Sequence, residues 1–279
     1  MATKVALNNG IALVVGAAGG IGKETAFAFA EAGVKGVMFA DINEQGAQDA
    51  GGESKKYATN EQYRFAVVKV DITDEASVQN MVDAAVKEFG RIDYNINSAA
   101  IGNISGAITP NLKIDVFSKT MEINVKGTML CVRAVTKVMA AQDPLEYKSR
   151  HGTRSLGRGS IVNLGSMSSY VASPGAMSYT ASKHAVIGIT KSAAIDCFKS
   201  NIRVNAVCPS WVDTPMMQAT LQRAPHLGQM IKAFSPLQRV ATADEVADYI
   251  VFLCSPSASY INGTGLAIDA GATLTVNAS

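Results

Sequence analysis

Short apolar runs that do not alternate with polar residues are the feature that most constrains the fold of this 279-residue chain. Residues 11–15 read IALVV, and segments with helical periodicity separate most of the later runs. Strands of this kind are buried on both faces, as in parallel sheets whose crossovers are helices. The pattern predicts one doubly wound α/β domain, residues 1–279, with about seven parallel strands at residues 11–15, 37–41, 64–70, 92–96, 160–164, 203–207 and 265–268.

The helical segments are expected at residues 21–33, 74–89, 116–140 and 243–253, with a further helix opening around Ser178. Two stretches lack apolar periodicity. Residues 43–56 are polar, and residues 142–158 hold five basic side chains and little apolar content. We interpret residues 142–158 as an exposed loop, with grip on an anionic substrate as the alternative.

Composition narrows the class of protein. A net charge of +2 gives no electrostatic reason to expect nucleic-acid binding. No apolar run is long enough for a membrane span, and the first ten residues lack the apolar core of a secretory signal, so we expect a cytoplasmic protein. The four cysteines form no Cys-x-x-Cys pair and the three histidines are scattered, which indicates free thiols and no metal site.

A glycine-rich turn follows the first strand and is spelled Gly16-Ala-Ala-Gly-Gly20-Ile21-Gly22. Glycines there permit a tight turn, and a helix N-terminus offers free N–H groups to a pyrophosphate. The spacing differs from the standard Gly-x-Gly-x-x-Gly fingerprint, and a purely structural turn is the alternative.

Asp41, followed by Ile42, ends the second strand. A carboxylate there can accept hydrogen bonds from an adenosine ribose and would repel a 2′-phosphate. No Arg or Lys lies within the glycine turn or directly after Asp41, which favours NAD over NADP. A solvated Asp at the end of a strand is the alternative interpretation.

Tyr179 and Lys183 are four residues apart, so on a helix they stand on one face. A phenol ionises near pH ~10. A neighbouring ammonium favours the phenolate, so Lys183 is expected to lower the pKa of Tyr179 and make it a proton donor and acceptor. An ordinary surface pair is the alternative.

Together these motifs resemble the short-chain dehydrogenase/reductase family over essentially the whole chain. Val15 stands where the family's Thr is usual, and Asn97-Ser-Ala99-Ala stands for its Asn-Asn-Ala-Gly. Ser166 precedes Tyr179 by 13 residues, the family's separation, which selects it over Ser168 and Ser169. In chain order the matching residues are Gly16, Gly20, Ile21, Gly22, Asp41, Asp71, Ile72, Asn97, Ala99, Asn124, Ser166, Tyr179, Lys183, Val212, Thr214, Gly263 and the segment Asp269-Ala-Gly271.

The resemblance implies a Rossmann-type fold and hydride transfer between a nicotinamide and a carbonyl or secondary alcohol. It implies that Tyr179 moves the substrate proton, Lys183 holds the nicotinamide ribose, and Ser166 stabilises charge on the substrate oxygen. Asn124 would hold a water near Lys183, or simply cap or kink its helix. The segment with Asp71 and Ile72 would contact adenine. Val212 and Thr214 would meet the nicotinamide amide, although Thr214 could be only a turn residue.

Substrate contacts are expected from the loops beyond the strand ends, at residues 101–108, 167–177 and 211–234. Their apolar side chains suggest a bulky apolar alcohol or ketone, with packing of a lid against the core as the alternative. These side chains are Ile104, Met167, Tyr170, Met177, Trp211, Met216, Met217, Leu221, Met230 and Phe234. No Arg is obviously placed for a carboxylate, although Arg223 and Arg239 keep that possibility open.

The Tyr179 helix carries small residues at three- and four-residue intervals, and the family commonly forms dimers and tetramers through long helices. We therefore expect a homo-oligomer, by preference a tetramer. Three functions stay open: an NAD-dependent alcohol dehydrogenase or ketoreductase, with NADP as the less favoured cofactor; an isomerase or dehydratase on the same scaffold; and a dinucleotide-sensing protein without enzymatic activity.

Overall fold

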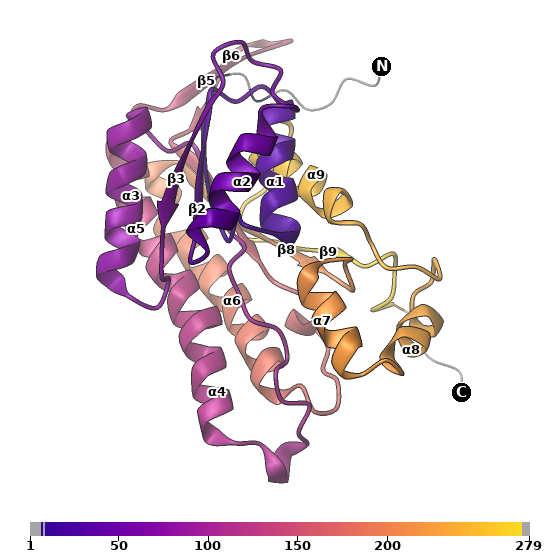
Figure 1. Cartoon of the computed structure of the whole chain (residues 1–279). Helices are drawn as coiled ribbons and strands as arrows, with labels where there is room; N and C mark the ends of the chain where they lie inside the picture. Colours follow the sequence, from indigo (N-terminus) through magenta and orange to yellow (C-terminus); the bar gives the residue numbers. More distant parts are fainter. Residues whose placement is uncertain (1–6, 8, 275–279) are drawn as a thin grey trace.

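A computed structural model describes residue 7 and residues 9–274, and it places a central sheet between two layers of helices (Figure 1). The sheet has seven strands in the order β3-β2-β1-β4-β7-β8-β9, and every neighbouring pair is parallel. The strands are β1 (Ile11–Val15), β2 (Gly36–Asp41), β3 (Arg64–Lys69), β4 (Tyr94–Asn97), β7 (Gly159–Leu164), β8 (Ile202–Pro209) and β9 (Gly265–Ile268). This confirms the predicted doubly wound sheet.

The strand order reverses between β1 and β4, because β2 and β3 extend the sheet on one side of β1 and the later strands extend it on the other. Val15 lies opposite both Ala40 and Asn97, so the carboxyl ends of three strands meet at this point. Parallel α/β sheets bind ligands at such a switch point.

Successive residues of the central strands enter two different cores. Val14, Phe39 and Ile96 pack beneath α1 (Gly20–Glu31), α2 (Glu44–Ser54) and α9 (Ala243–Cys254). Leu13 and Met38 pack beneath α3 (Glu75–Phe89), α5 (Thr128–Ala141) and α6 (Met177–Asp196) on the opposite face. Because both faces are covered, both alternate positions must be apolar, which explains the unalternating runs in the sequence.

Most of the polar segment 43–56 forms the helix α2 (Glu44–Ser54), which its polar composition did not predict. Asn43 caps α2 by accepting a hydrogen bond from the Gly46 N–H at 3.1 Å. The helix buries small residues, among them Ala47 and Ala50, so its apolar stripe is too thin to see in the sequence. Tertiary contact rather than intrinsic propensity holds such a helix.

The expected long helix at 116–140 is interrupted. It consists of α4 (Ile114–Met121) and α5, joined by a π-helical stretch at Glu122–Gly127. A π-helical turn inserts into an otherwise apolar periodic pattern, so periodicity alone did not reveal it.

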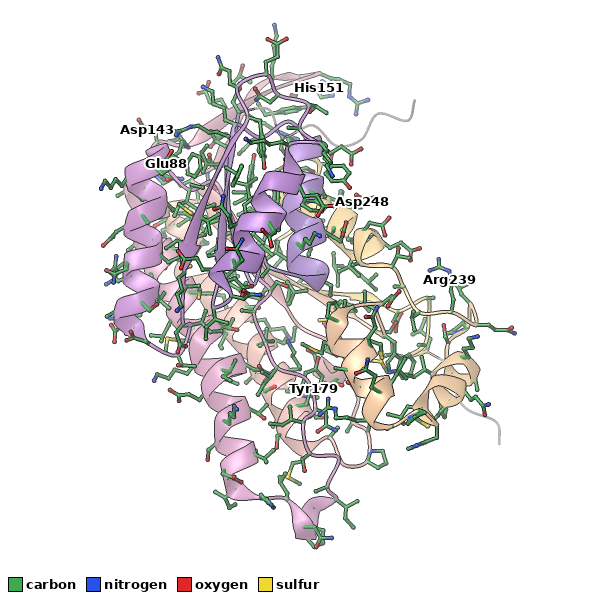
Figure 2. The ribbon with its side chains drawn as sticks, in the orientation of Figure 1. Glu88, Asp143, His151, Tyr179, Arg239 and Asp248 are labelled. Atoms are coloured by element: carbon green, nitrogen blue, oxygen red, sulfur yellow. The ribbon has the colours of Figure 1, made fainter. Side chains whose placement is uncertain are left out.

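The prediction of a loop at residues 142–158 was wrong. The segment forms an antiparallel hairpin of β5 (Leu145–Ser149) and β6 (Gly152–Gly157). The hairpin turns at residues 150–151, and Gly152, which follows the turn, has a φ of 112° that suits glycine. The Ser149 hydroxyl donates to the Gly152 carbonyl across the turn. It is mostly exposed, as expected, and its His151 lies near one end of the molecule, far from Tyr179 (Figure 2).

Two helices also replace most of the loop expected after β8, namely α7 (Pro215–Arg223) and α8 (Leu227–Phe234). Thr214 caps α7 by accepting a hydrogen bond from the Met217 N–H. Pro215 occupies the first helical position, where a backbone N–H would have no partner within the helix, so its missing N–H costs nothing. Within the described residues, no helix has the length and apolar content to cross a bilayer.

Candidate active site

The glycine turn forms a cradle in which Gly16 and Gly22 leave no room for a Cβ atom. Gly16 has a φ of 85°, and a Cβ on it would lie 2.6 Å from the Ala99 nitrogen. A Cβ on Gly22 would lie 2.1 Å from the Gly16 carbonyl oxygen. The N-cap of α1 is Gly19, which supplies no side-chain hydrogen bond, so the first N–H groups of the helix are available to a ligand. The cradle therefore fits the pyrophosphate of a dinucleotide.

The Asp41 carboxylate joins the glycine turn to the end of β2. One oxygen accepts a hydrogen bond from the Ala18 N–H at 2.9 Å, and the other accepts from the Asn43 N–H at 2.9 Å. Each carboxylate oxygen has a second lone pair, so Asp41 can still accept from a ribose. Ile42 beside it is 63% exposed. Lys23, which directly follows the glycine turn, pairs with Glu53 at 2.7 Å.

The loop after β8 meets the glycine turn from the other side. A Cβ on Gly20 would lie 3.4 Å from the Thr214 methyl carbon, so these two segments are in contact range. Val212 is buried and pairs through its backbone with Ala241. The structure thus brings Val212 and Thr214 to the cradle, close to Ile21, which lines the same cavity.

Three other predicted cofactor residues have structural partners. Asp71 is exposed and accepts two hydrogen bonds from Thr73, which lower the pKa of its carboxyl group. Ile72 is buried and packs against Gly127. The Asn97 amide donates to Asn163 Oδ1 at 2.8 Å inside the sheet. A role for these side chains at the cofactor stays a prediction.

Helix α6 is joined to the end of β7 by buried polar groups. Lys183 Nζ donates to the Leu164 carbonyl at 2.7 Å. The Ser169 hydroxyl accepts from the Ser166 N–H and donates to the Lys183 carbonyl. These bonds bring Ser166 beside Tyr179, to which it is linked by a side-chain hydrogen bond. The 13-residue spacing thus selected the Ser at the phenol, while Ser169 links strand and helix.

Burial is the largest influence on the pKa values of Tyr179 and Lys183. It raises the pKa of Tyr179, although the hydrogen bond with Ser166 opposes the rise and the residue is partly exposed where it lines the cavity. It lowers the pKa of Lys183 to about 8, because an ammonium loses solvation. Lys183 Nζ lies 5.6 Å from the centre of the Tyr179 ring. The expected lowering of the Tyr179 pKa by Lys183 is not met here, because burial raises that pKa and the group that opposes the rise is Ser166.

Asn124 lies in the π-helical stretch and is buried. Its Oδ1 accepts from the Ile101 N–H at 2.8 Å, and its Nδ2 donates to the Ile101 carbonyl at 2.9 Å and to Ser182 Oγ at 3.1 Å. The amide therefore fixes the loop after β4 against α6, at Ser182, which precedes Lys183 in the sequence. Asn124 thus stands where the helix deviates from α-helical winding, and its role in holding a water near Lys183 stays a prediction.

A cavity of about 500 Å³ opens over Ser166, Tyr179 and Lys183. It is lined by the loops after β4, β7 and β8, as expected. Of the predicted apolar contacts, five line it and five do not. Those that line it are Ile104, Met167, Trp211, Met216 and Met217, and those that do not are Tyr170, Met177, Leu221, Met230 and Phe234.

Two residues without a recognisable motif hold the walls of this cavity. Asn103 Nδ2 donates to the Gly175 carbonyl at 2.9 Å and joins the loops after β4 and β7. The Tyr170 hydroxyl donates to the Gly265 carbonyl at 2.7 Å and fixes the loop after β7 to β9. Polar loop residues of this kind carry no periodic signal, so the sequence did not single out their contacts.

Comparison with known proteins identifies the family. Residues 16–273 match the family model described as enoyl-(acyl carrier protein) reductase. A short-chain dehydrogenase, anuF, of Penicillium roqueforti is 44% identical over 268 residues, which cover 96% of this chain and 97% of that protein. The chain belongs to the short-chain dehydrogenase/reductase family.

Solved structures of this fold agree. Levodione reductase superposes with a TM-score of 0.84 at 28% identity, covering 96% of this chain and 99% of that one. A 3-ketoacyl-(acyl-carrier-protein) reductase from Brucella melitensis, complexed with NADH, has a TM-score of 0.81 at 28% identity. The match covers 96% of this chain and 100% of that one. As a short-chain dehydrogenase/reductase, the chain is an oxidoreductase of the alcohol dehydrogenase and ketoreductase type that uses NAD(P).

The cradle generates a stability prediction with an internal control. Gly22→Ala should lower the free energy of unfolding by about 1–3 kcal/mol, because its Cβ meets the Gly16 carbonyl and the turn must shift. Gly52→Ala in α2 should raise it by about 0.5–1 kcal/mol, since a Cβ there has open space and alanine favours the helix. Urea unfolding at one protein concentration measures both. Equal changes in the two variants would contradict the close approach at Gly22.

Proposed function

We propose that this short-chain dehydrogenase/reductase interconverts a secondary alcohol and a ketone on a bulky, largely apolar small molecule, with NAD(H) as its cofactor. The observation that carries the proposal is that Ser166, Tyr179 and Lys183 line one cavity that also reaches Ile21 of the glycine turn and Thr214. A hydroxyl, a phenol and an ammonium thus face the space where a carbonyl oxygen can lie beside a dinucleotide.

Each side chain then has a role that suits its surroundings. When bound, the nicotinamide supplies the hydride chemistry. Ser166 donates a hydrogen bond to the substrate oxygen and stabilises the charge that develops there. Tyr179 gives a proton to that oxygen during ketone reduction and takes it back during alcohol oxidation. The raised pKa of Tyr179 keeps the phenol protonated, which is the form that reduction requires.

Lys183 exchanges protons with the site and holds the cofactor. A pKa of about 8 lets its ammonium exchange protons near neutral pH. Its Nζ is directed at the Leu164 carbonyl at the end of β7, and its remaining protons can bond the nicotinamide ribose. Asn124 keeps the Ile101 loop and α6 at a fixed separation, which keeps Lys183 in place.

The preference for NAD rests on Asp41. Its carboxylate stands at the edge of the glycine turn, where the 2′-position of an adenosine ribose is read. The neighbouring Lys23 is engaged by Glu53 and does not offset the negative charge. The apolar character of the substrate rests on Ile104, Trp211 and two methionines, whose flexible side chains adapt to bulky shapes.

Tyr179→Phe should lower kcat for ketone reduction by at least about 10²-fold, because the variant cannot give a proton to the substrate oxygen. Binding of NADH, followed by its fluorescence, should change by less than about twofold, since the ring is retained. Absorbance of the nicotinamide must fall in step with product, which separates reduction from isomerisation. Tyr249→Phe on α9 is the control and should be fully active. An active Tyr179→Phe enzyme would remove this residue from the mechanism.

Asp41→Ala should reduce the preference for NADH over NADPH, measured as the ratio of kcat/KM values, by about tenfold or more, because a repelling charge is removed. Asp41→Asn keeps an oxygen that can accept from the Ala18 N–H and should shift the ratio in the same direction. Asp49→Ala, on the exposed side of α2, is the control. A ratio that stays constant in both Asp41 variants would show that the carboxylate does not select the cofactor.

We propose further that the chain forms a homotetramer in the cytoplasm, where its four cysteines stay free thiols. The outer side of α6 supports this assembly, because Gly188 and Ser192 are exposed and a Cβ on Gly188 would touch nothing. Ile114 and Ile195 add large apolar surface, with exposures of 78% and 70%. Sedimentation at micromolar concentration should give four times the chain mass of 29.2 kDa. A monomeric mass would overturn the proposal.

A further inference from the structure

We propose that Arg223 binds a negatively charged group of the substrate, so that the preferred substrates are bulky ketones and alcohols that carry a carboxylate at the end remote from the reacting oxygen. This inference rests on the proposed function and makes its substrate class more specific. It adds an acidic end to the apolar body that the cavity lining indicates.

Helix α7 separates Arg223 from the cofactor end of the cavity. The helix begins at Pro215, next to Thr214 and the glycine turn, and ends at Arg223. A rise of 1.5 Å per residue puts these two ends about 12 Å apart. Arg223 nevertheless lines the same cavity as Tyr179, together with Thr220 and Leu227. A ligand that touches both Tyr179 and Arg223 must therefore extend away from the cofactor, along α7.

The charges around the cavity are of one sign. Its lining contains no Asp or Glu among the described residues, and its two charged side chains are Lys183 and Arg223. Lys183 is buried and bonded to Leu164 beside the predicted proton-transfer residues. A cleft lined by one sign of charge concentrates ligands of the opposite sign. Arg223 is thus the cation left to attract a remote group.

The guanidinium of Arg223 has open donors. Its Nε donates to the Ala219 carbonyl of its own helix at 3.2 Å, and within the described part of the chain no carboxylate pairs with it. By contrast, Arg64, Arg133 and Arg239 each pair with a Glu. The two terminal nitrogens of Arg223 can therefore donate hydrogen bonds to both oxygens of a carboxylate, in the bidentate geometry that suits a guanidinium.

Two ketones of matched shape test this assignment: 4′-acetylbiphenyl-4-carboxylate and its methyl ester. The native enzyme should reduce the carboxylate with the higher kcat/KM. Arg223→Gln should lower the ratio of kcat/KM for the carboxylate to kcat/KM for the ester about tenfold. The change should come mainly from a higher KM for the carboxylate, because the lost contact is made equally in the ground state and the transition state. Arg223→Lys should retain part of the preference, since lysine is a point charge without the planar fork. Added NaCl at 0.5 M should weaken the preference of the native enzyme.

Arg239→Gln is the matched control. Arg239 is exposed, pairs with Glu245, lies outside the cavity lining and is seen near one side of the molecule, away from Tyr179 (Figure 2). This variant should keep the native ratio. Equal losses for carboxylate and ester in Arg223→Gln, or no loss for either, would overturn the inference while leaving the proposed function in place. A native enzyme that reduces neither ketone with NADH or NADPH would overturn both.

Discussion

The site depends on one buried hydrogen bond, from Lys183 Nζ to the Leu164 carbonyl. Helix α6 carries Tyr179, and the strand β7 leads into Ser166, so the two groups meet only if helix and strand keep this register. A buried ammonium is costly unless its donors are satisfied, and the carbonyl at the strand end reduces that cost. The burial that lowers the pKa of Lys183 thus also restricts the position of the helix, because Nζ must stay within reach of the Leu164 carbonyl.

A second constraint acts at the glycine turn, on the other side of the cavity, where backbone atoms occupy the space that side chains would need. The closest approaches around Gly16 and Gly22 leave atoms less than 3 Å from the positions of absent Cβ atoms. Such packing lets the N-terminus of α1 come up to the end of β1 and keeps its N–H groups accessible. Asp41 then fixes the turn through the Ala18 N–H, so one carboxylate both shapes the cradle and determines its charge.

The sequence predicted the sheet well because burial on both faces gives each strand a continuous apolar signal. The strand at Ile11–Val15 and that at Gly265–Ile268 have the predicted bounds. The hairpin at residues 145–157 was missed because its strands are exposed and polar, so they carry no burial pattern, and α2 was missed because it buries mainly alanine and glycine. The motif residues at Ser166 and Tyr179 came together as expected. The contacts of Asn103, Tyr170 and Ser169 depend on how separate loops meet, which local patterns do not encode.

The π-helical stretch at Glu122–Gly127 makes the length of this segment as important as its composition. A stretch of this kind is equivalent to one additional residue in an α-helix. Deleting a single residue there would restore regular α-helical winding and shift the residues of the stretch by one position, so their side chains would project in directions about 100° away from the present ones. The Asn124 amide would then leave Ile101 and Ser182, although α4 and α5 would keep their own amino acids. Natural variation in this chain should therefore tolerate substitutions around Asn124 better than changes in length.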